Sequence, residues 1–422
     1  MTFRRLFPVF LAIGITLPGF ALRIAHVSAP APLVALIAGS AILGAACILL
    51  WACDAAQADI SAALALAIVA LVAVAPEYAV DMYFTWQAGR HPEGRYAQYA
   101  VANMTGANRL LIGVAWSLVA AVFWLKARRP VALDSDRRTE LLFLGMATVY
   151  AFVIPIKGSL AWYDGVVFLG IYAWYMVLTS RRPFQVPEVH GPAEVVVALP
   201  PRPRRMATVS LFLVALLAIL ANAGPFSEGL IRTGSLLRID QFVLVQWLAP
   251  IASEAPEFVV ALMFAIRGKA GMALGSLLCA KLNQWTLLVG MIPPVYAASH
   301  GTWMHPIPMG ATQLHEILLT AAQSLLGVVV LGALRLSVGH AILLFALFVG
   351  QLVTPEFILY YPQTFPWHMS GDGVHRLYTV MYLVAVAALV LDSPRRVWQL
   401  GRGLEPAGAV DPSSVRPPGE SA

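Results

Sequence analysis

The sequence is poor in charged residues. Only 12% of its 422 residues are Lys, Arg, Asp or Glu, whereas about 25% is typical of soluble domains. So few charges cannot cover a water-soluble protein of this length, and 59% of the residues are hydrophobic. These values exclude a cytosolic globular enzyme, a disordered regulator and a nucleic-acid-binding protein. They leave a polytopic membrane protein.

Cysteines are scarce, and enzyme motifs are absent. The three cysteines (Cys47, Cys53 and Cys279) lie in apolar stretches without metal-ligand spacing, so neither a disulfide framework nor a thiolate site is indicated. His315 and Glu316 do not continue into HExxH, and the sequence has no GxSxG motif and no P-loop. We therefore expect no enzyme activity and no cofactor, and nothing in the sequence indicates an oligomeric state.

Apolar stretches predict an all-α architecture. Twelve segments are long enough to cross about 30 Å of hydrocarbon, at 6–22, 32–52, 59–84, 96–125, 140–156, 159–180, 206–227, 239–266, 269–298, 314–334, 337–357 and 374–391. Most of the 28 Lys and Arg residues fall in loops on the side of the N-terminus. The positive-inside rule then places both termini in the cytoplasm, in a bacterial inner membrane. The first segment also resembles a cleaved signal peptide, but we expect it to be retained.

The sequence contains an internal repeat. Residues 75–84 (APEYAVDMYF) match residues 255–264 (APEFVVALMF) at an offset of 180, and a weaker match of 99–113 with 272–290 follows at an offset of 173. In the predicted topology the two Pro-Glu segments cross the membrane in opposite directions, as in transporters with inverted repeats.

The predicted organisation follows from this repeat. Two inverted five-helix repeats are flanked by one extra helix at each end. The boundaries are an N-terminal helix (1–30), a first repeat (31–180), a cytoplasmic linker (181–205), a second repeat (206–360), a C-terminal helix (361–402) and a disordered tail (403–422).

Four acidic residues lie inside the apolar Pro-Glu segments, namely Glu77, Asp81, Glu254 and Glu257. Each costs roughly 2.5–3.5 kcal/mol at the centre of a bilayer, so we expect them to face a polar interior. Glu77 and Asp81 share a helix face, as do Ser253 and Glu257, because four residues separate the members of each pair.

The prolines of these segments add further oxygen ligands. Pro76 and Pro256 release the carbonyls of Val72 and Ala252 from helical hydrogen bonds. Carboxylates, hydroxyls and free carbonyls together suit a hard cation such as Ca²⁺ or Na⁺. The alternative is a kinked helix with a structural ion pair, which the repetition of the Pro-Glu pattern disfavours.

These features resemble the sodium/calcium exchangers of the calcium/cation antiporter superfamily. In that family two Pro-Glu glutamates bind Ca²⁺ and, alternately, Na⁺, and they match Glu77 and Glu257. Asn103 matches the Asn that opens the next helix, and Ser276 is its counterpart in the second repeat. The resemblance implies a secondary antiporter that exchanges Ca²⁺ for Na⁺ or H⁺ by alternating access, with inorganic cations and the lipid bilayer as its partners. A cation/proton exchanger not selective for Ca²⁺ and a cation channel remain as alternatives.

The sequence also departs from the family pattern. Ala73 and Val74 stand where the family has hydroxyl ligands for Na⁺, and in the second repeat Ser253 and Glu254 occupy the equivalent places. Lys281 replaces an Asn ligand, which predicts a fixed charge that substitutes for a transported cation, neutralises Glu254 or couples to protons.

Neighbouring polar residues complete the list of candidates. The alternative for Lys281 is a lysine that snorkels to the interface. Asn108 and Asn283 are its expected partners in coupling. We expect Arg109 to bind a helix end or a lipid phosphate, and Glu316 to be solvated near the end of a span.

Overall fold

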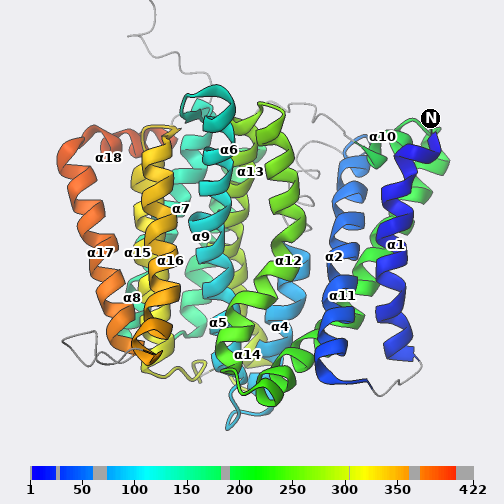
Figure 1. Ribbon diagram of the computed structural model, residues 1–422, viewed down its shortest axis with the longest axis horizontal. Helices are drawn as coiled ribbons and strands as arrows, with labels where there is room; N and C mark the ends of the chain where they lie inside the picture. Colours follow the sequence, from blue (N-terminus) through cyan, green and yellow to red (C-terminus); the bar gives the residue numbers. More distant parts are fainter. Residues whose placement is uncertain are drawn as a thin grey trace, which may run out of the picture.

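The computed structural model describes residues 2–24, 29–59, 74–181, 191–303, 305–360 and 371–404, and these residues are almost entirely helical (Figure 1). Eight of the described helices are long and apolar enough to cross a membrane. The all-α membrane architecture expected from the sequence is thereby confirmed, while the count of twelve spans stays a prediction.

The first half of the chain forms helices that alternate in direction between the two faces of the molecule (Figure 1). Their bounds are α1 (Thr2–Ile24), α2 (Ala31–Ala56), α4 (Ala75–Arg90), α5 (Tyr96–Leu110), the π-helical turn η1 (Leu111–Trp116), α6 (Ser117–Ala127), α7 (Arg138–Ala151), α8 (Val153–Lys157) and α9 (Trp162–Ser180).

The second half repeats this alternation. Its helices are α10 (Pro192–Val197), α11 (Pro201–Leu237), α12 (Gln241–Ile266), α13 (Ala270–Asn283), the π-helical turn η3 (Gln284–Leu288), α14 (Val289–His300), α15 (Ala311–Leu331), α16 (Val338–Tyr360), α17 (Gly371–Asp392) and α18 (Arg395–Leu400). The two Pro-Glu helices run in opposite directions, since α4 leads to the loop at the bottom of Figure 1 and α12 leads to α13 at the top.

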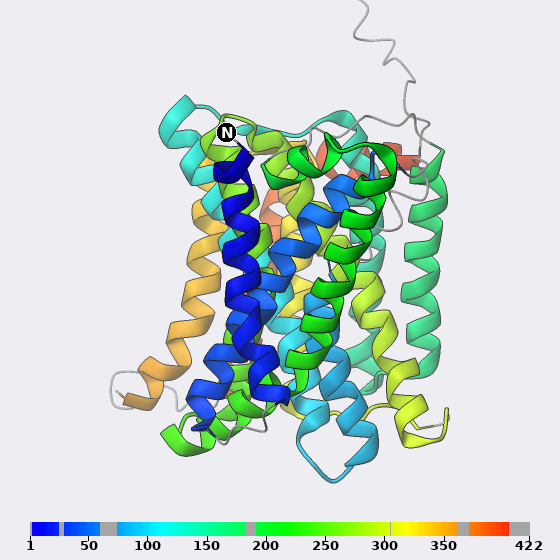
Figure 2. The same cartoon turned by 90° about the vertical axis from the view of Figure 1, so that its right-hand side faces the viewer.

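Helices α1, α2 and α11 pack together at one side of the molecule (Figure 2). Small residues allow their close approach: an added Cβ at Gly44 would lie 2.7 Å from the carbonyl oxygen of Ala12, and one at Gly229 would lie 2.9 Å from the backbone nitrogen of Ala35. Such contacts between small residues are a common means of packing helices in membranes. Helix α1 is thus an integral part of this three-helix group.

The basic loops between α6 and α7 and between α12 and α13 lie at the face that carries α10 and α18 in Figure 1. At this face β1 (Val131–Ala132) pairs antiparallel with β2 (Arg335–Leu336), which joins the α6–α7 loop to the α15–α16 loop. The chain after α18 folds back onto α7, where the hydroxyl of Thr139 donates to the carbonyl of Gly403 at 2.8 Å. The loop of residues 91–95 lies at the opposite face (Figure 1).

Two predicted boundaries differ from the structure. The predicted linker, 181–205, contains α10 and the first turn of α11 in its described part, and residues 182–190 lie outside the described residues, as do residues 405–422 of the predicted tail. Helix α11 also continues beyond its predicted end at residue 227. Glu228, the residue after the predicted end, lies inside α11. The hydroxyls of Tyr83 and Tyr96 donate to its carboxylate at 3.0 and 2.7 Å.

Candidate cation-binding site

Helix α4 carries the first acidic pair. It begins at Ala75, so Pro76 lies in the first turn, where the missing amide proton costs no helical hydrogen bond. Glu77 lies in the same turn, where the helix dipole favours a negative charge. Asp81 follows one turn later, and both carboxylates are buried. The predicted free carbonyl of Val72 lies outside the described residues.

Helix α12 carries the second acidic pair and differs from α4 because its prolines, Pro250 and Pro256, lie in the helix interior. Glu254 is buried, and Glu257 is partly exposed. The hydroxyl of Ser253 lies 3.2 Å from the carbonyl oxygen of Ala249, to which it donates. Ser253 therefore keeps its oxygen lone pairs free for a cation.

The two pairs meet where α4, α5, α12 and η3 pack together. The carboxyl group of Glu77 lies beside the carboxyl group of Glu254 and the side-chain amide of Gln284 in η3, and the charges of Asp81 and Glu257 act on it. Gln284 Nε2 donates to Glu254 Oε1 at 2.7 Å, and Asn103 Nδ2 to Asp81 Oδ1 at 3.4 Å. The structure thus gathers carboxyl and amide groups of both predicted repeats.

Several buried oxygens of this cluster have no donor. Within the part of the chain that the structure describes, no hydrogen bond reaches either oxygen of Glu77, nor one oxygen each of Asp81, Asn103, Glu254 and Gln284. Buried polar atoms without partners are costly. A hard cation coordinated by oxygen ligands would satisfy them.

Carboxylates alone do not complete the cluster. Among the described residues, no three His, Cys, Asp or Glu side chains are placed to hold a metal ion by themselves. A bound Ca²⁺ therefore requires amide, hydroxyl or carbonyl oxygens as further ligands. Asn103 and Gln284 are hydrogen-bonded to Asp81 and Glu254, and Ser253 directly precedes Glu254 in the chain, so these three residues are candidates.

Lys281 is completely buried and does not snorkel to the interface. Its ammonium group donates to the side-chain oxygen of Asn108 at 2.7 Å and to the carbonyl oxygen of the same residue at 3.1 Å. It also lies over the ring of Trp285, 4.7 Å from the centroid. The predicted pairing of Lys281 with Glu254 is corrected by these contacts, since Glu254 accepts from Gln284 instead.

Asn108 and Lys281 occupy corresponding positions of the two predicted repeats. They are 173 residues apart, and the π-helical turns η1 and η3 that follow them begin at residues with the same separation. π-helical turns within α-helices frequently mark functional sites. The contact therefore joins an amide of the first half to an ammonium of the second half.

Two predicted site residues have other positions. Ser276, the predicted counterpart of Asn103, is exposed on α13 and donates to the carbonyl of Ala273 at 2.9 Å, so the structure does not bring it to the site. The prediction for Ser276 is wrong because Ser276 and Met272 lie on a face of α13 that is turned away from the neighbouring helices. Asn283 is buried at the end of α13.

Sequence reasoning missed three buried polar residues on α4, α12 and α15. Thr85 follows Glu77 and Asp81 at the same spacing of four on α4, and its buried hydroxyl has no partner among the described residues. Gln246 of α12 meets Gly106 of α5 so closely that an added Cβ would lie 1.8 Å from the Gln246 carbonyl oxygen. Gln323 of α15 donates to the Arg109 carbonyl at 3.2 Å. Their presence inside apolar segments was the available signal.

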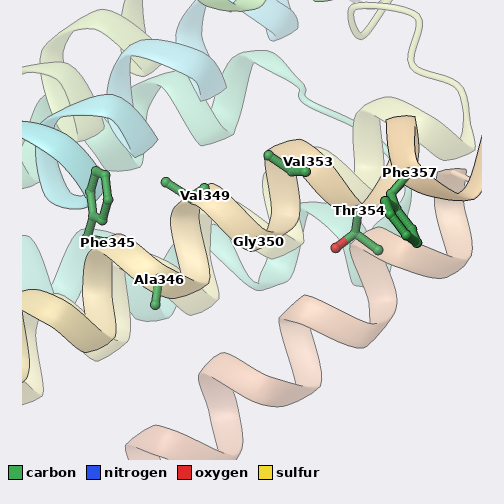
Figure 3. A pocket seen from close by; sticks show the side chains of 7 residues that line it. All are labelled: Phe345, Ala346, Val349, Gly350, Val353, Thr354 and Phe357. Atoms are coloured by element: carbon green, nitrogen blue, oxygen red, sulfur yellow. The ribbon is translucent and has the colours of Figure 1, made fainter.

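A pocket of about 590 Å³ lies elsewhere, along α16 between Phe345 and Phe357 (Figure 3). Its lining is almost entirely apolar, and Thr354 is hydrogen-bonded to Tyr378 of α17 at 2.9 Å. It contains none of the acidic residues of the Pro-Glu helices.

The fold and the buried acidic cluster define an integral membrane protein of the ion-transporter class. The family model for sodium/calcium exchanger proteins matches residues 30–181 and 207–355. The chain belongs to this family, and so to the calcium/cation antiporter superfamily, as the resemblance implied. The family consists of transporters and not of catalytic enzymes.

Individual proteins are also similar to this chain. The crystal structure of the H⁺/Ca²⁺ exchanger CAX superimposes with a TM-score of 0.87 at 38% identity, covering 95% of this chain and 98% of that one. A putative antiporter, CaxA of Alkalimonas amylolytica, is 26% identical over 54% of this chain and 67% of its own length. An uncharacterized membrane protein of Methanocaldococcus jannaschii is 25% identical over 43% of this chain, and the match spans 58% of that protein.

Proposed function

We propose that this protein is a secondary antiporter that exchanges Ca²⁺ for H⁺ across a bacterial inner membrane, by alternating access at Glu77 and Glu257. The observation that carries the proposal is the set of buried oxygens without donors around Glu77, Asp81 and Glu254. Their number and hardness suit Ca²⁺. When Ca²⁺ leaves, protons on the same carboxylates would remove the repulsion among them.

Two observations favour H⁺ as the counter-ion. The similar solved protein is described as an H⁺/Ca²⁺ exchanger. Ala73 and Val74 supply no hydroxyl where the family has Na⁺ ligands. Na⁺ remains the second candidate, because the matching family is that of sodium/calcium exchangers and Ser253 supplies one hydroxyl beside the cluster.

Ion flux in proteoliposomes tests the proposal. ⁴⁵Ca²⁺ uptake by the purified protein is measured under an imposed pH gradient, an imposed Na⁺ gradient or no gradient. We expect the pH gradient to drive uptake. Uptake driven by Na⁺ alone would make Na⁺ the counter-ion, and equal uptake under all three conditions would refute antiport and favour a channel.

Glutamine variants test the site. Glu77→Gln and Glu257→Gln remove one charge each with little change in volume, so each should abolish exchange while the protein still inserts and folds. Glu93→Gln is the matched control, because Glu93 is an exposed carboxylate in the loop between α4 and α5. Near-normal Ca²⁺ flux in either site variant would contradict the assignment.

A further inference from the structure

A second cluster of charges lies beside the candidate site, between α5, α15 and α17. Arg109 of α5 and Glu316 of α15 form an ion pair, and each side chain is only 2% exposed. The Arg109 guanidinium also lies over the Trp247 ring of α12, 5.1 Å from its centroid. The expectations of a lipid-bound Arg109 and a solvated Glu316 are therefore wrong, because the two residues form an ion pair with each other inside the protein.

His375 of α17 extends this pair toward the membrane surface. Its Nε2 lies 3.2 Å from Glu316 Oε1, whereas Arg109 contacts the other carboxylate oxygen, Oε2. Because Nε2 faces a carboxylate oxygen, which can only accept, Nε2 carries the proton of the neutral imidazole. The other ring nitrogen, Nδ1, has no hydrogen-bond partner among the described residues. Glu316 thus bridges α5 and α17, and His375 retains one nitrogen that can accept a proton.

The charged and titratable groups around His375 come from three helices. Glu316 and His315 lie on α15, Arg109 lies on α5, and Asp372 and Arg376 lie on α17 itself. Asp372 Oδ1 is 3.6 Å from His315 Nδ1, and Arg376 Nε donates to His315 Nε2 at 3.2 Å. Asp372 and His315 are 30% and 19% exposed. The cluster therefore extends from the face that carries loop 91–95 to the buried Arg109.

The cluster is mechanically connected to the candidate site. Arg109 follows Asn108, whose side chain and carbonyl hold the Lys281 ammonium. Helix α15 holds this part of α5 at two levels, because Glu316 pairs with the Arg109 side chain and Gln323 donates to the Arg109 carbonyl. These two residues of α15 lie about two helical turns apart, on one face.

We propose that Arg109, Glu316 and His375 form a proton-responsive cluster that regulates cation affinity at the neighbouring site. With neutral His375 the charges of Arg109 and Glu316 cancel. Protonation of His375 at Nδ1 leaves these three side chains with one net positive charge, and it makes His375 a competitor of Arg109 for the carboxylate. The added charge opposes cation binding, so acidification promotes release. This inference rests on the proposed function.

Ca²⁺ self-exchange in proteoliposomes is the test, because it needs no gradient of a counter-ion. The half-saturating Ca²⁺ concentration is measured at pH 8 and pH 6, with equal pH on both sides. Acidification should raise the half-saturating Ca²⁺ concentration of the wild-type protein. In His375→Gln the ratio of the value at pH 6 to the value at pH 8 should be smaller by at least about fivefold, a typical size of coupling between sites. His91→Gln is the control, since His91 is exposed in the loop at the same face, and it should keep the wild-type ratio.

A second variant reaches the cluster without altering His375. Arg109→Gln combined with Glu316→Gln removes both charges of a buried pair, which is often tolerated, and it should also reduce the ratio. This variant carries the test if His375→Gln cannot be reconstituted. A wild-type ratio in a reconstituted variant would refute the cluster while leaving Ca²⁺ transport intact. Absence of self-exchange by the wild-type protein would instead refute the proposed function.

Discussion

Replacing Lys281 by Asn tests whether its ammonium acts as a built-in cation of the transport site. The shorter side chain cannot reach the two oxygens of Asn108, which Nζ now contacts at 2.7 and 3.1 Å. Each buried acceptor that loses its donor costs about 1–3 kcal/mol. Loss of the donor to both oxygens of Asn108 therefore predicts a decrease of about 2–6 kcal/mol in the free energy of unfolding. Thermal unfolding of the solubilised variant measures this loss.

The same substitution changes the charge of the site. Lys281 acts electrostatically on Glu77, and its removal leaves the acidic cluster one unit more negative. One unit of charge is worth about 4 kcal/mol at 4 Å and about half of that at 8 Å, for an effective dielectric constant of about 20. We therefore expect the half-saturating Ca²⁺ concentration to fall more than about tenfold, with a steeper dependence on the counter-ion.

Two comparisons make this prediction specific. Lys126→Asn also removes an ammonium group that donates to a backbone carbonyl, that of Ile266 at 2.7 Å, but this contact lies on the surface. The substitution should therefore change neither the free energy of unfolding nor the half-saturating Ca²⁺ concentration appreciably. Lys281→Asn combined with Glu254→Ser restores the net charge. This double variant should recover the counter-ion dependence but not the stability, because Glu254 is bonded to Gln284 and not to Lys281. Unchanged stability and ion dependence in Lys281→Asn would refute the reasoning.

Two further predictions concern the faces of the molecule. An impermeant thiol reagent added from the periplasm should label Glu93→Cys, in the loop between α4 and α5, and spare Arg129→Cys, in the loop between α6 and α7; the reverse pattern would invert the proposed topology. At the face that carries α10, hydrogen bonds from Arg204 at 2.7 and 2.8 Å hold the pKa of Asp59 well below its usual range. A lowered folded-state pKa gives stability that is present above the unfolded-state pKa of about 4 and is lost as the pH falls through the folded value. Thermal unfolding between pH 7 and pH 3 should therefore show a smaller acid-induced loss in Asp59→Asn than in the wild-type protein, and equal losses would contradict this contribution.

The helices and the acidic positions could be predicted from the sequence because both depend on local composition. An apolar segment flanked by polar residues must be helical in a bilayer, and the predicted start of α12 at residue 239 differs from the observed Gln241 by two residues. The cap explains this agreement, since Asp240 Oδ1 accepts from the amide of Phe242 at 2.8 Å. Burial of Glu77 and Asp81 followed from the cost of charge in hydrocarbon.

The partners of charged side chains could not be predicted in this way. A partner depends on how each helix is rotated and on which neighbour it contacts, and hydropathy determines neither. Arg109 and Glu316 illustrate the difficulty, since they come from helices more than 200 residues apart and neutralise each other in the interior. Ser276 illustrates a different error, because the predicted alignment of the repeats was taken to imply an equivalent orientation, whereas Ser276 lies on an exposed face of α13.

The departures from symmetry are informative about the mechanism. In the first half Pro76 lies in the first turn of α4, so Glu77 lies at the positive end of the α4 dipole. In the second half Pro256 lies inside α12, so Glu257 has no helix end to stabilise its charge. The positive charge of the second half comes instead from Lys281, which crosses to the Asn108 position of the first half. Each half thus supplies one fixed positive element to a shared acidic cluster, and only the ammonium is a full charge. A site balanced in this way needs fewer mobile cations to neutralise its carboxylates, so we infer that fewer counter-ions accompany each Ca²⁺ than in a site built from two equivalent amides.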